Sequence, residues 1–334
     1  METFPENTSM ENFSFYYYEF NETVDVDYKY NVSKFFIPYL LVFAVGLIGN
    51  ALVLYIVLRF RKMWTTSNIY MFSLALGDLF YMLCLLFFAT EIASSYWPLG
   101  AFMCRLFWTL TTLTTFSSIY FLAVMSISVF IQLYFPAFSK KRCGLKAASL
   151  TSLVVWILCL LLGTPIFIHA DMDEYNNCKI FWPNPVAFWK ISVTSYTFTM
   201  AFLLPLTLIL IFLILTALRA RNQEKTTETD FDSLKENLVL IAVLCLVYVI
   251  VWLPTHVLEI ISSTVYNFHI DEGVYYGVSL ISYLKSCIYP ILFGFLSQSF
   301  KEAFKKVLCC KKMQNGDSPH QHPPERQEEK STIC

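Results

Sequence analysis

The chain has 334 residues, of which 56% are hydrophobic and 15% are charged. Soluble domains usually carry about 25% charged residues, so this chain lacks the polar surface that it would need in water. Its 24 basic and 25 acidic residues give a formal net charge of −1, which provides no basic excess for binding nucleic acid. Length alone would allow roughly two soluble domains, but the distribution of the apolar residues excludes that interpretation.

Seven apolar runs follow one another along the chain, and each is long enough to cross a hydrocarbon core as a helix. The runs are Phe35–Leu58, Ile69–Thr90, Leu106–Ser139, Ala147–Ala170, Ile191–Leu218, Asn237–Leu258 and Val274–Phe300. Only two of the runs contain an Asp, Glu, Lys or Arg residue: the second contains Asp78 and the last contains Lys285. Buried helices of a soluble protein are a poor alternative for seven such runs separated by polar loops. We therefore expect an all-α fold, a seven-transmembrane helix bundle.

Glycan acceptor triplets and basic residues predict the same orientation. Four Asn-x-Ser/Thr triplets precede the first run, at Asn7, Asn12, Asn21 and Asn31, and the rest of the chain has none. Such triplets are modified in the secretory lumen, which places the N-terminus outside the cell. Lys and Arg residues follow the first, third, fifth and seventh runs, which places those segments in the cytosol.

The chain is expected to divide into three sections. Residues 1–34 would form an extracellular, glycosylated arm in which seven acidic residues outnumber two lysines. Tyrosines among these acids are candidates for sulfation, and a plain glycosylated tail is the alternative. Residues 35–300 would form the bundle, and residues 301–334 an amphipathic helix and a cytosolic tail.

Cysteine positions predict one disulfide bond. Of the ten cysteines, only Cys104 and Cys178 lie outside the membrane on the predicted outer side. Two thiols in an oxidising compartment favour one bridge, which would hold the loop between spans 4 and 5 over the bundle. On the cytosolic side, Cys309 and Cys310 follow span 7 in an expected amphipathic helix, residues 298–312. They are candidates for palmitoylation, and two free thiols are the alternative.

Local motifs occur in order along these spans. They are Gly49-Asn50-Ala51-Leu52-Val53, Leu74-Ala75-Leu76-Gly77-Asp78, Trp97-Pro98-Leu99-Gly100 before Cys104, Trp156, Pro205, Trp252-Leu253-Pro254 and Pro290. From about Phe35 to Lys312 the chain resembles a rhodopsin-like G-protein-coupled receptor. Within that family it is most similar to the somatostatin, opioid and neuropeptide B/W receptors. The resemblance implies a plasma-membrane receptor with an extracellular peptide ligand and a heterotrimeric G protein as partners, and with surrounding membrane lipid.

The cytosolic motifs depart from the family pattern. The family's Asp-Arg-Tyr triplet in span 3 falls on Ser128, Val129 and Phe130. Val129 can neither form an ion pair nor donate a hydrogen bond from its side chain. In span 7 the family's Asn-Pro-x-x-Tyr pattern begins at Tyr289 and ends at Phe293, which lacks the hydroxyl group. The resemblance therefore implies an atypical, apolar switch and weak or absent agonist-driven G-protein activation.

The expected ligand pocket also departs from the family pattern. The related peptide receptors carry an Asp seven residues after the span 3 cysteine, and that position is Thr111 here. Glu259 lies about two helical turns above Trp252 on the same face and is the preferred substitute for the missing negative charge. An acid that simply reaches water at a helix end is the alternative. The remaining candidates for contact with the ligand are Glu91, Thr255 and Tyr283.

A charged pair is expected inside the membrane. Asp78 and Ser118 match positions where family members hold a sodium ion, and the usual Asn five residues before Pro290 is Lys285. A lone charge at mid-membrane is costly, so we expect Asp78 and Lys285 to pair and occupy that site without sodium. Snorkelling or deprotonation of Lys285 is the alternative.

Three classes of function remain. The first is a peptide-activated receptor, and the second is a decoy or scavenging receptor for peptides or chemokine-like ligands that does not couple to a G protein. A transporter or channel is a third, although the spans show no internal duplication. No enzyme is expected, since His169, His256 and His269 lack metal-ligand or nucleophile spacing, and no cofactor or metal is expected. Binding of arrestin requires phosphoacceptors, and the tail contains three, Ser318, Ser331 and Thr332.

Overall fold

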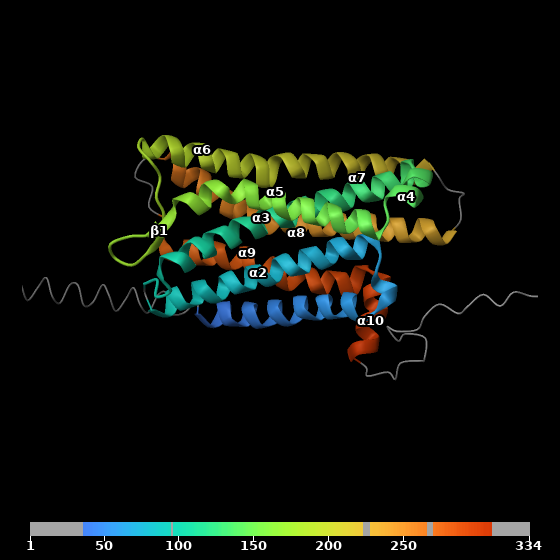
Figure 1. The fold of residues 1–334 in the computed structure, drawn as a ribbon, viewed down its shortest axis with the longest axis horizontal. Coiled ribbons are helices and arrows are strands. Elements are labelled where there is room, and N and C mark those ends of the chain that lie inside the picture. The colour runs from blue at the N-terminus through green and yellow to red at the C-terminus, as the bar shows by residue number, and fades with distance from the viewer. Residues whose placement is uncertain (1–35, 95, 223–227, 266–269, 309–334) are drawn as a thin grey trace, which may run out of the picture.

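The computed structural model describes residues 36–94, 96–222, 228–265 and 270–308. The extracellular arm with its four glycan acceptors, and the lipidation candidates Cys309 and Cys310, lie outside the described residues. Within those residues, seven helices are long and apolar enough to cross a membrane. Figure 1 shows them side by side along the long axis of the molecule.

The membrane-length helices follow the predicted runs in order. They are Phe36–Arg59, α2 (Thr66–Ser94), α3 (Gly100–Tyr134), α5 (Leu145–His169), a composite fifth helix, α8 (Glu228–Thr264) and α9 (Glu272–Leu296). The fifth consists of α6 (Val186–Phe198), a π-helical turn η2 (Thr199–Leu203) and α7 (Leu204–Asn222). Short helices complete the described chain: η1 (Arg61–Met63), α4 (Pro136–Arg142) and α10 (Gln298–Leu308).

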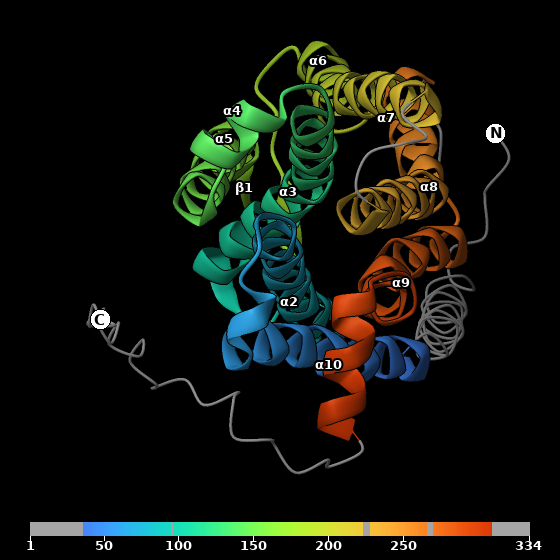
Figure 2. The same ribbon diagram turned by 90° about the vertical axis from the view of Figure 1, so that its right-hand side faces the viewer.

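The helices surround a core in which α3 packs against α2, α5, α7 and α8 (Figure 2). Large apolar side chains such as Leu161 and Phe295 are exposed on the outside, where lipid would cover them. Polar side chains such as Asn50, Ser118 and Ser286 are buried inside. The exposed apolar surface fits a chain whose solvent is hydrocarbon.

Two predicted runs each extend past the end of a membrane-length helix. The run Val274–Phe300 ends as a helix at Leu296, because Ser297 is extended and α10 begins at the next residue. The run Leu106–Ser139 is interrupted at Phe135, and Pro136 begins α4. Proline suits the first turn of a helix, where its missing N–H group leaves no hydrogen bond unmade. Hydropathy alone does not register such breaks.

The short helix α10 turns away from α9 and packs against its end (Figures 1 and 2). Phe300 is fully buried, with its ring centroid 5.7 Å from that of Phe293. Phe304 approaches Gly294 so closely that a Cβ atom there would lie 3.1 Å from its ring. Lysine residues 301, 305 and 306 are exposed on the other side. The helix is therefore amphipathic, and it begins at Gln298, before the predicted section boundary at residue 301.

A small antiparallel hairpin covers the predicted outer end of the bundle. It pairs β1 (Ala170–Met172) with β2 (Cys178–Ile180), an element that the all-α prediction did not include. The disulfide bond Cys104–Cys178 joins it to α3, with the two Cα atoms 5.5 Å apart. The guanidinium group of Arg105 on α3 also donates a hydrogen bond of 2.7 Å to Asp171. Strand pairing across a short polar turn produces no hydropathy signal, which is why the hairpin was missed.

Candidate functional site

A cavity of about 350 Å³ lies among α2, α3, α6, α8 and α9, near the hairpin. Its size falls in the range of small-molecule and peptide-anchor pockets. Aromatic side chains make up much of its wall: Tyr81, Phe88, Phe107, Trp108, Phe116, Trp182, Trp252, Tyr275 and Tyr283. The cavity is thus a mostly apolar space with a few polar groups.

Five of the six candidate ligand contacts meet at this cavity. Its lining includes Thr111, Trp252, Thr255, Glu259 and Tyr283. Glu91 of α2 is not part of the lining. The side chain of Glu259 is 47% exposed, as expected for an acid near the mouth rather than at the floor.

Stacked aromatic rings form the inner part of the lining. Tyr81 stacks on Tyr283 with ring centroids 4.2 Å apart and lies 6.0 Å from the ring of Trp252. The hydroxyl groups of Tyr81 and Ser282 are 2.8 Å apart, which joins α2 to α9. The buried hydroxyl of Tyr248 donates to the carbonyl oxygen of Ala201 in the π-helical turn η2, at 2.8 Å. A ligand that moved Trp252 would therefore act on a connected set of helices.

The cavity lining also includes residues that were not identified from the sequence as ligand contacts, among them Trp108, His256 and Lys190. Trp108 lies on α3, and His256 of α8 lies one turn after Trp252, so it shares the same helix face. His256 is 2% exposed, and its Nδ1 atom is 3.4 Å from a carboxylate oxygen of Glu259. Lys190 of α6 donates a hydrogen bond of 2.8 Å to the carbonyl oxygen of Ser262. Helical periodicity from Trp252 could have found His256, whereas no sequence signal pointed to Lys190.

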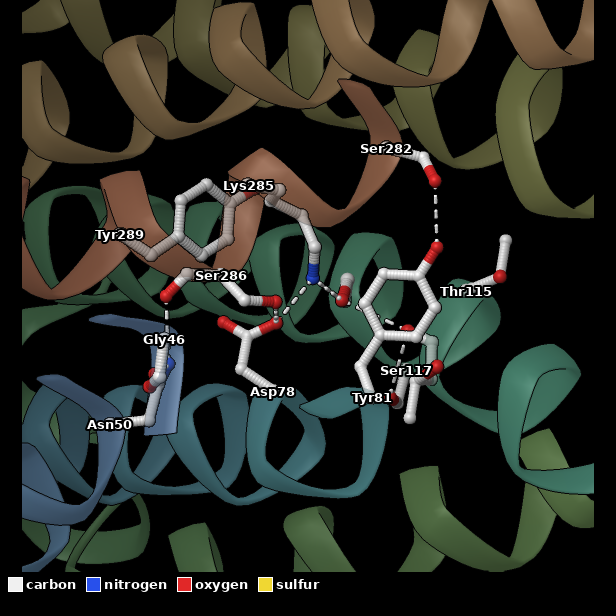
Figure 3. Close-up of polar contacts among 12 residues, drawn as sticks. Gly46, Asn50, Asp78, Tyr81, Thr115, Ser117, Ser282, Lys285, Ser286 and Tyr289 are labelled. Atoms are coloured by element: carbon white, nitrogen blue, oxygen red, sulfur yellow. Dashed lines mark hydrogen bonds and ion pairs between the residues drawn. The ribbon is translucent and has the colours of Figure 1, made fainter. Parts of the chain in front are cut away.

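A second polar site lies deeper in the bundle, where Asp78 of α2 faces Lys285 of α9 (Figure 3). The Lys285 Nζ atom is 2.6 Å from Asp78 Oδ1, and each side chain is 1% exposed. Lys285 also donates to Ser118 Oγ of α3 at 2.6 Å. The lysine therefore joins three helices through two short polar contacts.

Neighbouring groups complete this network. Ser286 donates to Asp78 Oδ1 at 2.9 Å, and Asn50 of the first helix donates to the backbone carbonyl of Ser286 at 2.7 Å. The Lys285 ammonium lies 5.2 Å from the ring centroid of Tyr289 and 5.8 Å from that of Tyr81. Aromatic faces attract a nearby cation. Figure 3 shows these side chains gathered around the lysine.

The atypical positions at the other end of α3 lie in apolar surroundings. Val129 is 2% exposed. Ser128 accepts a hydrogen bond of 3.2 Å from Gln132 one turn further along the same helix. Phe130 stacks on Tyr134 at 4.4 Å and packs edge-on against Phe212 of α7 at 5.1 Å. Packing of aromatic rings thus holds this end of α3 against α7.

The atypical positions of α9 are buried as well. The hydroxyl of Tyr289 donates to the carbonyl oxygen of Leu244 on α8 at 3.1 Å. Phe293 is fully buried between Tyr289 and Phe300 of α10. The ring of Phe293 therefore serves as a packing surface for α10.

Clusters of metal-ligating side chains are absent from the part of the chain that the structure describes: no three His, Cys, Asp or Glu residues there could share an ion. The polar chemistry of the described bundle is that of hydrogen bonds and one buried ion pair.

Comparison with known proteins agrees with this architecture. Residues 49–293 match the family described as 7 transmembrane receptor (rhodopsin family). The chain is 36% identical to somatostatin receptor type 5 of Rattus norvegicus over 304 residues, covering 88% of this chain and 84% of the relative. It is 32% identical to somatostatin receptor type 2 of Mus musculus over 283 residues, covering 82% and 77%. The chain therefore belongs to the rhodopsin-like family of G-protein-coupled receptors, as a multi-pass protein of the plasma membrane with its N-terminus outside the cell.

Proposed function

We propose that this chain is a receptor for an extracellular peptide and signals through a heterotrimeric G protein. The observation that carries the proposal is the cavity of about 350 Å³, which joins the outer hairpin to Trp252 and its neighbours. Relatives that cover most of the chain are named as somatostatin receptors, which supports a peptide as the ligand class. A peptide side chain that entered the cavity would press on Trp252 and alter the packing of α8.

A cationic group on the peptide would pair with Glu259. The carboxylate is half exposed and lies on the cavity lining, whereas position 111 carries a neutral threonine. Pairing at a partly exposed site costs less desolvation than pairing deep in the bundle. We therefore place the charge recognition of the peptide near the mouth.

The ion pair between Asp78 and Lys285 would take the role that a bound sodium ion has in related receptors. The lysine amine supplies a tethered positive charge at the carboxylate and also bonds Ser118. Because the cation is covalently part of α9, it cannot leave the site during activation. We propose that it fixes the spacing of α2, α3 and α9 in every state of the receptor.

A decoy or scavenging receptor is the second candidate, and a specific observation favours it. Val129 is buried and apolar where the family carries the arginine that contacts the G protein. A receptor without that contact could capture peptide, or a chemokine-like ligand, without activating a G protein. The two candidates share the cavity and differ only at the cytosolic end.

A screen separates these candidates. A library of cationic peptides is applied to cells expressing the protein, with saturable binding and G-protein activation measured in parallel. The proposal predicts that at least one peptide binds the receptor and activates a G protein. Glu259→Gln should weaken binding of that peptide, and Thr111→Trp, which fills the cavity, should abolish it. A Lys190→Gln variant controls for loss of a charged residue at the same lining. Binding without activation would favour the decoy, and no saturable binding would contradict a peptide receptor.

A further inference from the structure

Five polar side chains on the cavity lining carry buried atoms that lack a hydrogen-bond partner. Trp108 and Thr111 lie on α3, and Trp252, Thr255 and His256 lie on α8. The buried atoms are the indole Nε1 of both tryptophans, the two threonine hydroxyl oxygens and Nε2 of His256. None of these atoms forms a hydrogen bond with any part of the chain that the structure describes.

Such a group of unpartnered atoms is unusual in a folded protein. Most buried polar atoms are hydrogen-bonded, and a native structure leaves few exceptions. Here the exceptions gather on two helices that pack against one another and line a single cavity. A ligand that supplied the missing partners would form hydrogen bonds that the protein does not make by itself.

The chemistry of these atoms restricts the occupant. An indole N–H can only donate, so both tryptophans need an acceptor. An ammonium group carries donors and no acceptor, and it would leave both indoles unsatisfied. The hydroxyl of Thr255 can donate and accept, so it can bond either the carbonyl oxygen or the N–H group of an amide.

The charges on the cavity lining further restrict the chemical group that can bind there. The described lining includes one lysine, Lys190, and one glutamate, Glu259. Lys190 already donates a hydrogen bond to the carbonyl oxygen of Ser262. A carboxylate on the ligand would come close to Glu259, whose oxygen lies 3.4 Å from His256 Nδ1. An uncharged carbonyl accepts from the indoles and meets no repulsion. The aromatic walls, including Phe107 and Phe116, suit apolar groups beside it.

We propose that the ligand carries uncharged amide groups flanked by apolar side chains, with its deepest carbonyl bonded by Trp252 and a carbonyl nearer the hairpin bonded by Trp108. The inference rests on the proposed function, since it assigns the chemistry of the same cavity. The cationic group of the same peptide lies further out at Glu259. Seven residues of helix separate Glu259 from Trp252, which is about 10 Å at about 1.5 Å per residue. The peptide is therefore recognised by an amide at the floor of the cavity and by a cation nearer its mouth.

Three fragments built on the same phenylethyl skeleton test this assignment without knowledge of the full peptide. N-acetylphenylalaninamide carries two neutral amides, N-acetylphenylalanine has a carboxylate in place of one of them, and phenethylamine carries a cation and no amide. Their affinities are measured by saturation-transfer NMR on the purified full chain in lipid nanodiscs, with empty nanodiscs correcting for partition into lipid. The amide should bind at least about fivefold more tightly than the other two, as expected for about one hydrogen bond.

Conservative substitutions identify the side chains that bond the amide. Trp108→Phe and Trp252→Phe keep an aromatic ring and remove the donor, and each should weaken the amide about fivefold. Trp156→Phe is the matched control, because Trp156 packs against Phe80 and Phe121 and lies outside the cavity lining. Thr111→Asp places a carboxylate in the cavity and should reverse the preference toward phenethylamine.

The outcomes separate this inference from the proposed function. Equal or tighter binding of phenethylamine or N-acetylphenylalanine by the wild type would overturn the inference, as would unchanged amide affinity in both Trp→Phe variants. Peptides from the screen could still bind and signal in that case, and the proposed function would stand. The predicted order of fragments without any peptide that binds would instead support the inference and contradict the proposed function.

Discussion

Lys285 and Asp78 form an ion pair of 2.6 Å in the interior of the bundle, where each side chain is 1% exposed. The two residues are separated by 207 positions in the sequence and come from α9 and α2. Neither charge has access to water in this position, so each depends on the other. The pair therefore ties folding of the seventh span to that of the second.

Removing one partner should damage the fold more than removing both charges. Lys285→Ala or Asp78→Ala leaves an uncompensated buried charge, which typically costs about 3 to 5 kcal/mol. Asp78→Asn with Lys285→Asn should recover part of that loss, because neutral amides can bond each other and Ser118. Surface expression and thermal unfolding in detergent measure the effect, with Lys190→Ala as a lysine control outside the network. Single variants as stable as the wild type would show that the pair is dispensable.

Peptide binding by the wild type should not respond to sodium. The Lys285 ammonium already contacts Asp78 and would repel a second cation at that carboxylate. Affinity of a peptide found in the screen is measured in sodium chloride and in N-methylglucamine chloride at equal ionic strength. Lys285→Asn removes the tethered charge and should introduce a sodium effect. A sodium-specific change in the wild type would refute the proposed role of the lysine.

Polar residues restored at the end of α3 should raise signalling. Ser128→Asp with Val129→Arg supplies the ion pair and the G-protein contact that the family carries. In the wild type, aromatic packing of Phe130 holds this end of α3. The measurement is peptide-driven G-protein activation at matched surface expression. Ser128→Asn with Val129→Met controls for side-chain size without charge. Wild-type activation as strong as that of the restored variant would show that the apolar end couples by another route.

The turn of the outer hairpin should tolerate mild acid. Hydrogen bonds from Lys179 and then from Asn177 hold the pKa of Asp173 below its usual range. A lowered pKa in the folded state stabilises the turn above the unfolded pKa, near 4, and the contribution is lost as pH falls through the lower folded value. Hydrogen exchange of residues 170–180, corrected for intrinsic rates, should be the same at pH 7 and pH 5. Asp173→Asn should speed exchange at both, and a wild-type loss of protection between them would contradict the assignment.

The bundle could be predicted from the sequence because its signal is strong and local. Seven long apolar runs predict seven membrane-spanning helices, and the structure contains them. The two cysteines on the outer side predict one disulfide bond, which the structure also contains. The ends of the helices were less predictable. Ser297 and Phe135 interrupt the helix by backbone conformation inside apolar stretches, where composition does not change.

The site was predictable only in part, for a different physical reason. Lys285 drew attention because a charge in an apolar run requires a partner, and Asp78 was the one available on another span. Trp108 and His256 gave no such signal, because an aromatic residue in a membrane helix is ordinary until its neighbours are known. Their importance comes from the absence of partners for their nitrogen atoms within the described structure, which only the packing of α3 against α8 reveals.

The central claim, that this cavity binds a peptide and drives a G protein, is tested most directly by nucleotide exchange in a purified system. The receptor is reconstituted in nanodiscs with a heterotrimeric G protein and the tightest-binding peptide from the screen. We predict weak but saturable exchange by the wild type, stronger exchange by the Ser128→Asp, Val129→Arg variant, and none by Thr111→Trp. Saturable peptide binding with no exchange in either the wild type or the restored variant would contradict the claim.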